Sequence, residues 1–143
     1  MKPPEEVRRD LVRQWLVKAR EDLTAAEILV AQQPPLLGII GFHCQQSAEK
    51  YIKAFLVLHD IKFTKTHDIE LLIDMIGNVD NSLADVLHDA IILSDYGVDV
   101  RYPGDIPELT PEEAKEAVKL AGMVRDVIRS ALKEFLEEGS SDT

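Results

Sequence analysis

The sequence predicts an all-α protein, an antiparallel up-and-down helical bundle of about five helices. Apolar residues recur at three- and four-residue steps along most of the chain, as on the buried side of an amphipathic helix. No stretch alternates apolar and polar residues over more than a few positions, which argues against strands. Short connectors separate the periodic stretches and favour antiparallel neighbours. The 143 residues fit a single domain with one core, which we expect to span residues 1–143 with a frayed tail at about 138–143.

The first expected helix runs from about 5 to 32. Pro3 and Pro4 suit its start, and Pro34 and Pro35 interrupt the chain after it. One long apolar face combines Val7, Leu11, Trp15, Ala19, Leu23, Ala26 and Val30. The basic residues that lie mostly off this face are Arg8, Arg9, Arg13, Lys18 and Arg20. They form either a binding patch or, as is usual for charges on a helix, a solvated surface.

The second expected helix, from about 37 to 59, is apolar over most of its circumference and so belongs in the middle of the bundle. Gly38 and Gly41 lie in its first turns, where we expect another backbone to pass closely, because glycine otherwise weakens a helix. Its polar residues fall at offsets of 0, 3, 7 and 10, which places them on one stripe. This stripe is a candidate working surface and consists of His43, Gln46, Lys50 and Lys53.

Three further segments complete the chain. We expect a third helix that Thr66 caps and Gly77 ends, and a fourth helix from about 82 to 93. Residues 94–109 contain two glycines and two prolines and are expected to form an ordered loop, which at such a length is often functional. A capping box at residues 110–113 starts the last helix, which we expect to continue to about 137.

Composition excludes several classes of protein. The one cysteine, Cys44, has no partner for a disulfide within the chain, which suits a reducing compartment. No stretch approaches the ~18 uncharged residues of a membrane span, and the N-terminus lacks the apolar run of a signal peptide. We therefore expect a cytoplasmic protein without membrane contact. Cys44 is expected to act as a small buried hydrophobic residue.

The net charge of −10 is concentrated in the middle of the chain, because residues 66–116 hold thirteen of the acidic residues and two of the basic ones. A broad basic face for binding duplex DNA is therefore not expected. Any contact with a nucleotide or RNA is therefore expected to involve only a small part of the surface.

His-Asp pairs at residues 59–60, 67–68 and 88–89 invite comparison with all-helical metal-dependent phosphohydrolases. Adjacent residues on a helix point in different directions, however, and no histidine pair has the spacing of metal ligands. We therefore predict no metal ion and no other cofactor. First-turn and surface positions explain these histidines equally well.

Arg101 and Tyr102 stand out because the nearest basic residues are Lys65 and Lys115. A guanidinium beside an aromatic ring is suited to hold a phosphate and a base. The alternative is that Arg101 pairs with a neighbouring carboxylate and locks its loop. Composition alone favours this alternative.

The sequence resembles a known family at three places. Residues 42–73 are similar to the core signature of HEPN domains and read FHCQQSAEKYIKAFLVLHDIKFTKTHDIELLI. They contain its Gln-x-Ala-Glu-Lys-x-x-Lys-Ala helix, a short connector and a Thr-His-Asp-Ile helix start. Residues 101–104, RYPG, resemble the Arg-Tyr-Pro segment of the same branch and are followed by a Glu-rich helix start.

The resemblance implies a helical bundle that usually dimerises and is proposed to bind nucleotides. It also implies a prokaryotic protein that acts beside a minimal nucleotidyltransferase or in a toxin-antitoxin pair. Many relatives are metal-independent ribonucleases with an Arg followed four to six residues later by a His. That spacing is absent here, because Asp105, Ile106 and Pro107 follow Arg101 at those distances.

We therefore predict a nucleotide- or RNA-associated binding module that is a homodimer and acts with a nucleotidyltransferase partner. The residues expected to contact the nucleotide or RNA are Arg101, Tyr102, Lys50, Lys53, His67 and His43. The first alternative is a ribonuclease toxin whose site combines Arg101 and His67 within the fold or across a dimer. A scaffold without a ligand is a further alternative.

Overall fold

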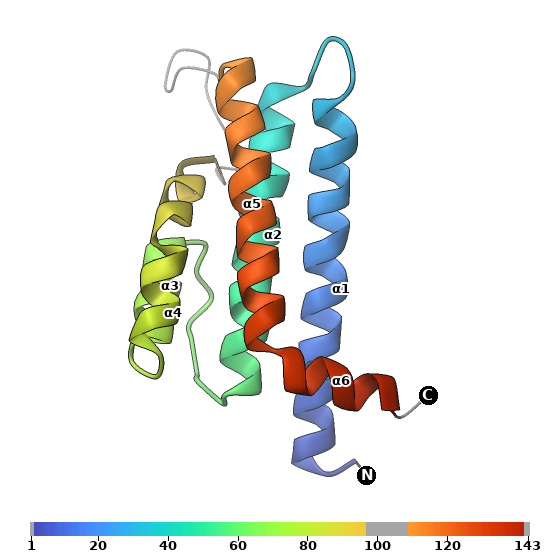
Figure 1. Cartoon of the computed structure of the whole chain (residues 1–143), viewed down its shortest axis with the longest axis vertical. Helices are drawn as coiled ribbons and strands as arrows, with labels where there is room; N and C mark the ends of the chain where they lie inside the picture. Colours follow the sequence, from blue (N-terminus) through green and yellow to red (C-terminus); the bar gives the residue numbers. More distant parts are fainter. Residues whose placement is uncertain (1, 97–108, 142–143) are drawn as a thin grey trace.

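The computed structural model describes residues 2–96 and 109–141 and is helical almost throughout (Figure 1). Its elements are α1 (Pro4–Val30), α2 (Leu37–Leu58), α3 (Ile69–Gly77), α4 (Asn81–Leu87), the 3-10 helix η1 (His88–Tyr96), α5 (Pro111–Ala131) and α6 (Lys133–Ser141). No strand occurs in the described ranges. The predicted all-α helical bundle is confirmed.

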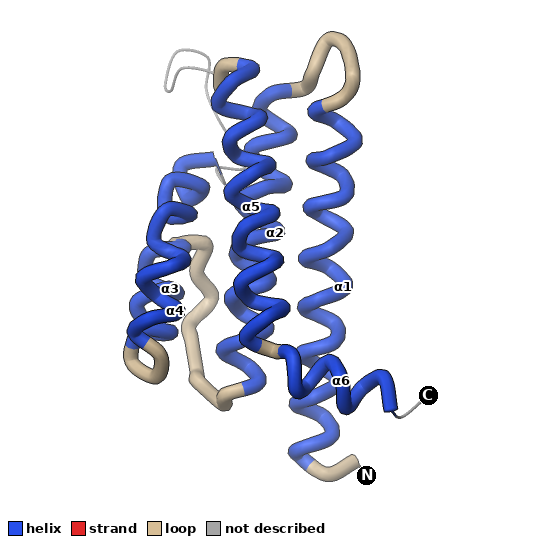
Figure 2. The backbone as a smooth tube through the Cα atoms, viewed as in Figure 1, coloured by secondary structure: helices blue, strands red, loops and turns tan. Residues whose placement is uncertain are grey.

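Three long helices, α1, α2 and α5, lie side by side, and the shorter α3, α4 and η1 form a group beside α2 (Figure 1). The connector between α2 and α3 runs back along α2 instead of turning directly into the next helix (Figure 2). Asp60 begins this reversal with φ 55°, a left-handed conformation that Asp tolerates better than most residues. As a consequence α2 and α3 run in the same direction, which differs from a strict up-and-down order.

Helix α2 is the centre of the bundle, as its composition predicts. Thirteen of its 22 residues are buried, and its neighbours include α1, α3, η1 and α5. Small residues allow close packing on α1, where the Ser47 hydroxyl donates a hydrogen bond to the Ala19 carbonyl at 2.8 Å. Burial raises the pKa of the Cys44 thiol to about 12, so the expected packing role of this residue is confirmed.

The two glycines of α2 differ in their surroundings. A Cβ at Gly41 would lie 2.5 Å from Leu109 Cδ1 and 3.1 Å from Tyr96 Cβ, whereas a Cβ at Gly38 would have no neighbour within 4 Å. A close approach therefore occurs at Gly41, where side chains and not the predicted backbone come near, and the prediction is wrong at Gly38. Tyr96 and Leu109 flank residues 97–108, so both flanks of that segment meet α2 at the same point.

Helix boundaries differ from the prediction at α3. Its N-cap is Asp68, whose side chain accepts a hydrogen bond from the Leu71 amide, and Thr66 instead accepts one from the Asp68 amide. Asp is as good an N-cap as Thr, and its position two residues later starts the helix later. Gly77 is the last helical residue, and Asn78 after it keeps right-handed dihedral angles.

The predicted fourth helix is divided. Regular α-helix ends at Leu87, and residues 88–96 continue as a 3-10 helix. The tighter turn keeps Ala90 and Leu93 buried, although the apolar period of an α-helix is lost. The first residues of the expected loop are therefore helical, and residues 97–108 lie outside the described part of the chain.

The last helix also breaks, at Leu132, where the backbone leaves helical geometry. After the break α6 crosses α1 (Figure 1). This direction buries Phe135 beneath the guanidinium groups of Arg9 and Arg13, at 4.7 and 5.2 Å from its ring centroid. Helix α6 extends to Ser141 and so includes residues that we expected to belong to the frayed tail.

Candidate functional site

The buried carboxylate of Glu49 on α2 contacts three other polar side chains, and we call the four residues the Glu49 cluster: Gln45, Glu49, Lys53 and His67. Glu49 Oε1 lies 2.8 Å from His67 Nδ1 and accepts a hydrogen bond of 2.8 Å from Gln45 Nε2. Its second oxygen accepts a hydrogen bond of 2.8 Å from Lys53 Nζ. Both oxygens of the carboxylate are therefore occupied.

The cluster forms because two segments lie side by side. The i,i+4 spacing of Gln45, Glu49 and Lys53 places the three side chains along one side of α2. The returning connector then adds its own groups, since Lys53 Nζ donates to the Thr66 carbonyl at 3.1 Å and Gln45 Nε2 to the His67 carbonyl at 3.2 Å. His67 is thereby held at both its ring and its backbone.

The three ionisable side chains of the Glu49 cluster differ in how far they are buried. The side chains of Glu49 and Lys53 are 3% and 8% exposed, whereas that of His67 is 68% exposed. Lys53 also lies over the rings of Trp15 and Phe63, at 5.5 and 5.6 Å from their centroids. Glu49 and Lys53 therefore form a nearly dry ion pair, and His67 is the part of the cluster that solvent reaches.

The His67 ring is held through Nδ1, which leaves Nε2 available to contact a ligand. Its Nδ1 faces the Glu49 carboxylate, which favours the tautomer that carries a proton on this nitrogen. Within the described part of the chain, no hydrogen bond occupies Nε2. An imidazole held in this way can accept a proton at Nε2 or, when charged, donate a hydrogen bond to an anion.

A second group of polar side chains lies between α1 and α2 and is called the Asp22 cluster: Asp22, His43 and Lys50. One oxygen of Asp22 lies 2.9 Å from His43 Nδ1, and the other accepts a hydrogen bond of 2.5 Å from Lys50 Nζ. The side chains of the cluster are largely covered. The polar stripe predicted on α2 is thus divided between two carboxylates that balance its lysines.

The six predicted contact residues are placed as follows. His67 and Lys53 meet in the Glu49 cluster, and His43 and Lys50 meet in the Asp22 cluster. Arg101 and Tyr102 lie outside the described residues. The structure therefore places four of the six candidates, in two separate pairs.

Sequence reasoning missed the two carboxylates. Glu49 has a recognisable signal, because it lies four residues from both Gln45 and Lys53 on a helix that is otherwise apolar. Asp22 has none, because it lies on another helix and 21 residues from its nearest partner in the chain. A solvated acidic residue and a buried one look the same in the sequence of α1.

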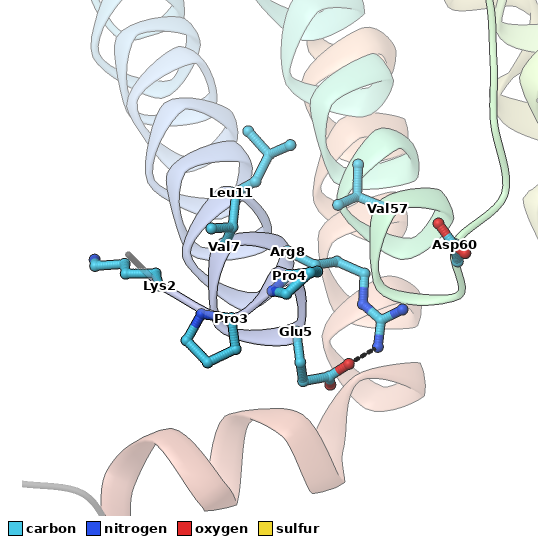
Figure 3. A pocket seen from close by; sticks show the side chains of 9 residues that line it. All are labelled: Lys2, Pro3, Pro4, Glu5, Val7, Arg8, Leu11, Val57 and Asp60. Carbon is cyan, nitrogen blue, oxygen red and sulfur yellow. Dashed lines mark hydrogen bonds and ion pairs between the residues drawn. The ribbon is translucent and has the colours of Figure 1, made fainter.

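No three His, Cys, Asp or Glu side chains gather as metal ligands within residues 2–96 and 109–141. A wide pocket of about 1040 Å³ lies elsewhere, between the start of α1 and the end of α2 (Figure 3). Its lining includes the aliphatic side chains of Val7, Leu11 and Val57, and an ion pair between Glu5 and Arg8 lies at its edge. It contains no histidine and shares no residue with either cluster.

Comparisons with known proteins agree with the helical fold. The model of the HEPN domain family matches residues 12–131. A solved structure, that of TT1696 from Thermus thermophilus, is similar with a TM-score of 0.64 and 26% identity, over 83% of this chain and 96% of that one. No curated protein matches the chain. None of the described helices has the length and apolar character needed to cross a membrane.

Proposed function

Because the chain belongs to the HEPN domain family, we propose that it is a binding module for the phosphate groups of a nucleotide or an RNA. The observation that carries this proposal is the exposed ring of His67, held through Nδ1 by the buried Glu49 carboxylate. In this role the charged imidazolium ring of His67 donates a hydrogen bond from Nε2 to a phosphate oxygen. Lys53 acts indirectly, because it balances the charge of Glu49.

Other proposed contacts are Arg101 and Tyr102, which lie outside the described residues, and Lys50 and His43 of the Asp22 cluster. The last two are tied to Asp22 and are therefore less available to a ligand than His67. His67 is therefore the residue to test first.

Replacing His67 by alanine should weaken binding of ATP or of a labelled single-stranded RNA about tenfold, since a hydrogen bond to a charged group contributes about 1.5–3 kcal/mol. Calorimetry for ATP and fluorescence anisotropy for RNA measure the change. His88→Ala is the matched control, because His88 is an exposed histidine outside both clusters. Equal affinities of the His67→Ala variant and the unmodified protein would reject this site.

The same geometry favours a second function, a metal-independent ribonuclease toxin of a toxin-antitoxin pair. A histidine oriented by a carboxylate is suited to move a proton during cleavage of a phosphodiester. In this case purified protein cleaves labelled RNA in the presence of EDTA, and His67→Ala and Arg101→Ala both abolish the cleavage. That outcome would replace the binding module by the enzyme.

A nucleotidyltransferase partner and a homodimer complete the proposed function. The group formed by α3, α4 and η1 exposes Leu71, Val86 and Ile92 in a stretch without Lys or Arg between residues 65 and 101. An acidic surface with exposed apolar side chains suits a basic protein partner.

Light scattering should give twice the 16.0 kDa mass of one chain for the purified protein. It should give a larger complex after co-expression with a minimal nucleotidyltransferase from the same genome. Val86→Asp should prevent the larger complex and leave the dimer intact. A monomer in both samples would contradict both parts of this proposal.

A further inference from the structure

Three arginines meet on the opposite side of the α1–α2 pair from His67. Arg20 of α1 and Arg125 and Arg129 of α5 line a pocket of about 350 Å³ together with Tyr51 of α2. The positions of Glu49 and Tyr51 on α2 differ by about 200° around the helix axis, because each residue advances by about 100°. The pocket is therefore separate from the Glu49 cluster.

The positive charge of this pocket is unusual on a chain of net charge −10. Arg125 is paired with Asp126, through a bond of 2.9 Å from Nε. Arg20 and Arg129 form no ion pair with any carboxylate in the described residues. Glu27 is the one acidic residue of the lining, and it also has no partner among the described residues within ion-pair distance. The three guanidinium groups outnumber the two carboxylates beside them, those of Asp126 and Glu27, so the pocket keeps a net positive charge that attracts an anion.

The hydroxyl of a tyrosine whose ring is buried completes the pocket. Tyr51 is 1% exposed and lines the same space as the arginines. Its hydroxyl forms no hydrogen bond within the described residues and is not among their fully buried unpaired polar atoms, so it is accessible from the pocket. Burial raises the pKa of Tyr51, and the nearby Arg125, Arg129 and Arg20 oppose this effect. The phenol therefore keeps its proton at neutral pH and can donate it to an acceptor.

We propose that Arg20, Arg125, Arg129 and Tyr51 form a binding pocket for the phosphate group of a small phosphate-bearing ligand. Guanidinium groups match the geometry of phosphate oxygens, and arginine gives up its water more readily than lysine. The Tyr51 hydroxyl supplies a neutral donor in the same pocket. The volume is near the lower limit of about 300–1,000 Å³ for ligand pockets, so it suits a phosphate and part of the group that carries it.

This inference is independent of the proposed function, because it uses none of the residues around His67. Pyrophosphate, AMP and adenosine serve as probes, and calorimetry measures their affinities. The unmodified protein should bind pyrophosphate at millimolar concentrations or below and should not bind adenosine. Tighter binding of AMP than of pyrophosphate would identify a nucleotide as the source of the phosphate group.

Removing an arginine and removing the Glu27 charge should change the affinity for pyrophosphate in opposite directions. Arg20→Ala and Arg129→Ala each remove an exposed arginine and should weaken pyrophosphate binding about tenfold. Glu27→Gln removes the opposing charge and should strengthen it several-fold. Lys119→Ala on the exposed side of α5 is the control and should leave the affinity unchanged.

The pattern of affinity losses distinguishes the arginine pocket from the His67 site. A loss confined to the arginine variants supports the pocket even if the His67 site fails. Absence of pyrophosphate binding, or equal losses in the arginine variants and Lys119→Ala, would overturn the proposal, because the effect would then reflect only net charge. Tyr51→Phe keeps the ring in place and should weaken binding less than removal of an arginine.

Discussion

Replacing Glu49 by alanine should lower the free energy of unfolding by about 3–5 kcal/mol, because it leaves the buried ammonium group of Lys53 without its charge partner. Both side chains are almost fully covered, and the Glu49 carboxylate accepts hydrogen bonds from two residues of α2. The substitution also frees the His67 ring and with it one attachment of the connector to α2. Urea unfolding followed by circular dichroism measures the loss.

A double-mutant cycle tests the cause. Lys53→Met removes the buried charge and keeps most of the side-chain volume, so the Glu49→Ala/Lys53→Met protein should recover much of the stability lost in Glu49→Ala. Glu70→Ala is the matched control, because Glu70 is exposed on α3 and its loss should cost less than about 0.5 kcal/mol. If Glu49→Ala and Glu49→Ala/Lys53→Met lose the same free energy of unfolding, the unpaired charge of Lys53 does not cause the destabilisation.

Replacing Phe135 by alanine should lower the free energy of unfolding by about 3–5 kcal/mol, the usual loss for a buried phenylalanine. Phe135 attaches α6 to α1 through its contacts with Arg9 and Arg13. We also expect a loss of helical signal, because α6 is too short to remain helical without this contact. Urea unfolding and the ellipticity of the native protein measure the two effects.

The ion pair that Glu138 of α6 forms with Arg9 provides the control for Phe135→Ala. Glu138 pairs with Arg9 at the surface, and an exposed ion pair contributes at most about 1 kcal/mol. Glu138→Gln should therefore have a small effect. If it destabilises the protein as much as Phe135→Ala, charge and not apolar burial attaches α6.

The sequence predicts the fold well where periodicity alone decides it. The enclosure of α2 and the capping box of α5 are visible in the residues and are confirmed by the structure. The break at Leu132 is not visible, because the apolar spacing continues through it and the contact of Phe135 with α1 determines the new direction. The 3-10 geometry after Leu87 likewise depends on how Ala90 and Leu93 pack.

The candidate site is less predictable. The sequence identifies His67, Lys50 and Lys53, but it does not show that both lysines are balanced by carboxylates. The same limit applies to Arg20 and Arg129, which lie on different helices and more than a hundred positions apart in the chain. Charge counting shows an acidic protein, and only the packing of the helices shows where its positive charge gathers.

The path of the connector along α2 has a consequence for folding. Glu49 and His67 are 18 positions apart, whereas Arg9 and Glu138 are separated by 129. Contacts between near neighbours in the chain close at a lower entropic cost than contacts between its ends. The support of His67 can therefore assemble early from one continuous stretch, while the docking of α6 on α1 has to wait until every helix from α1 to α6 has been made.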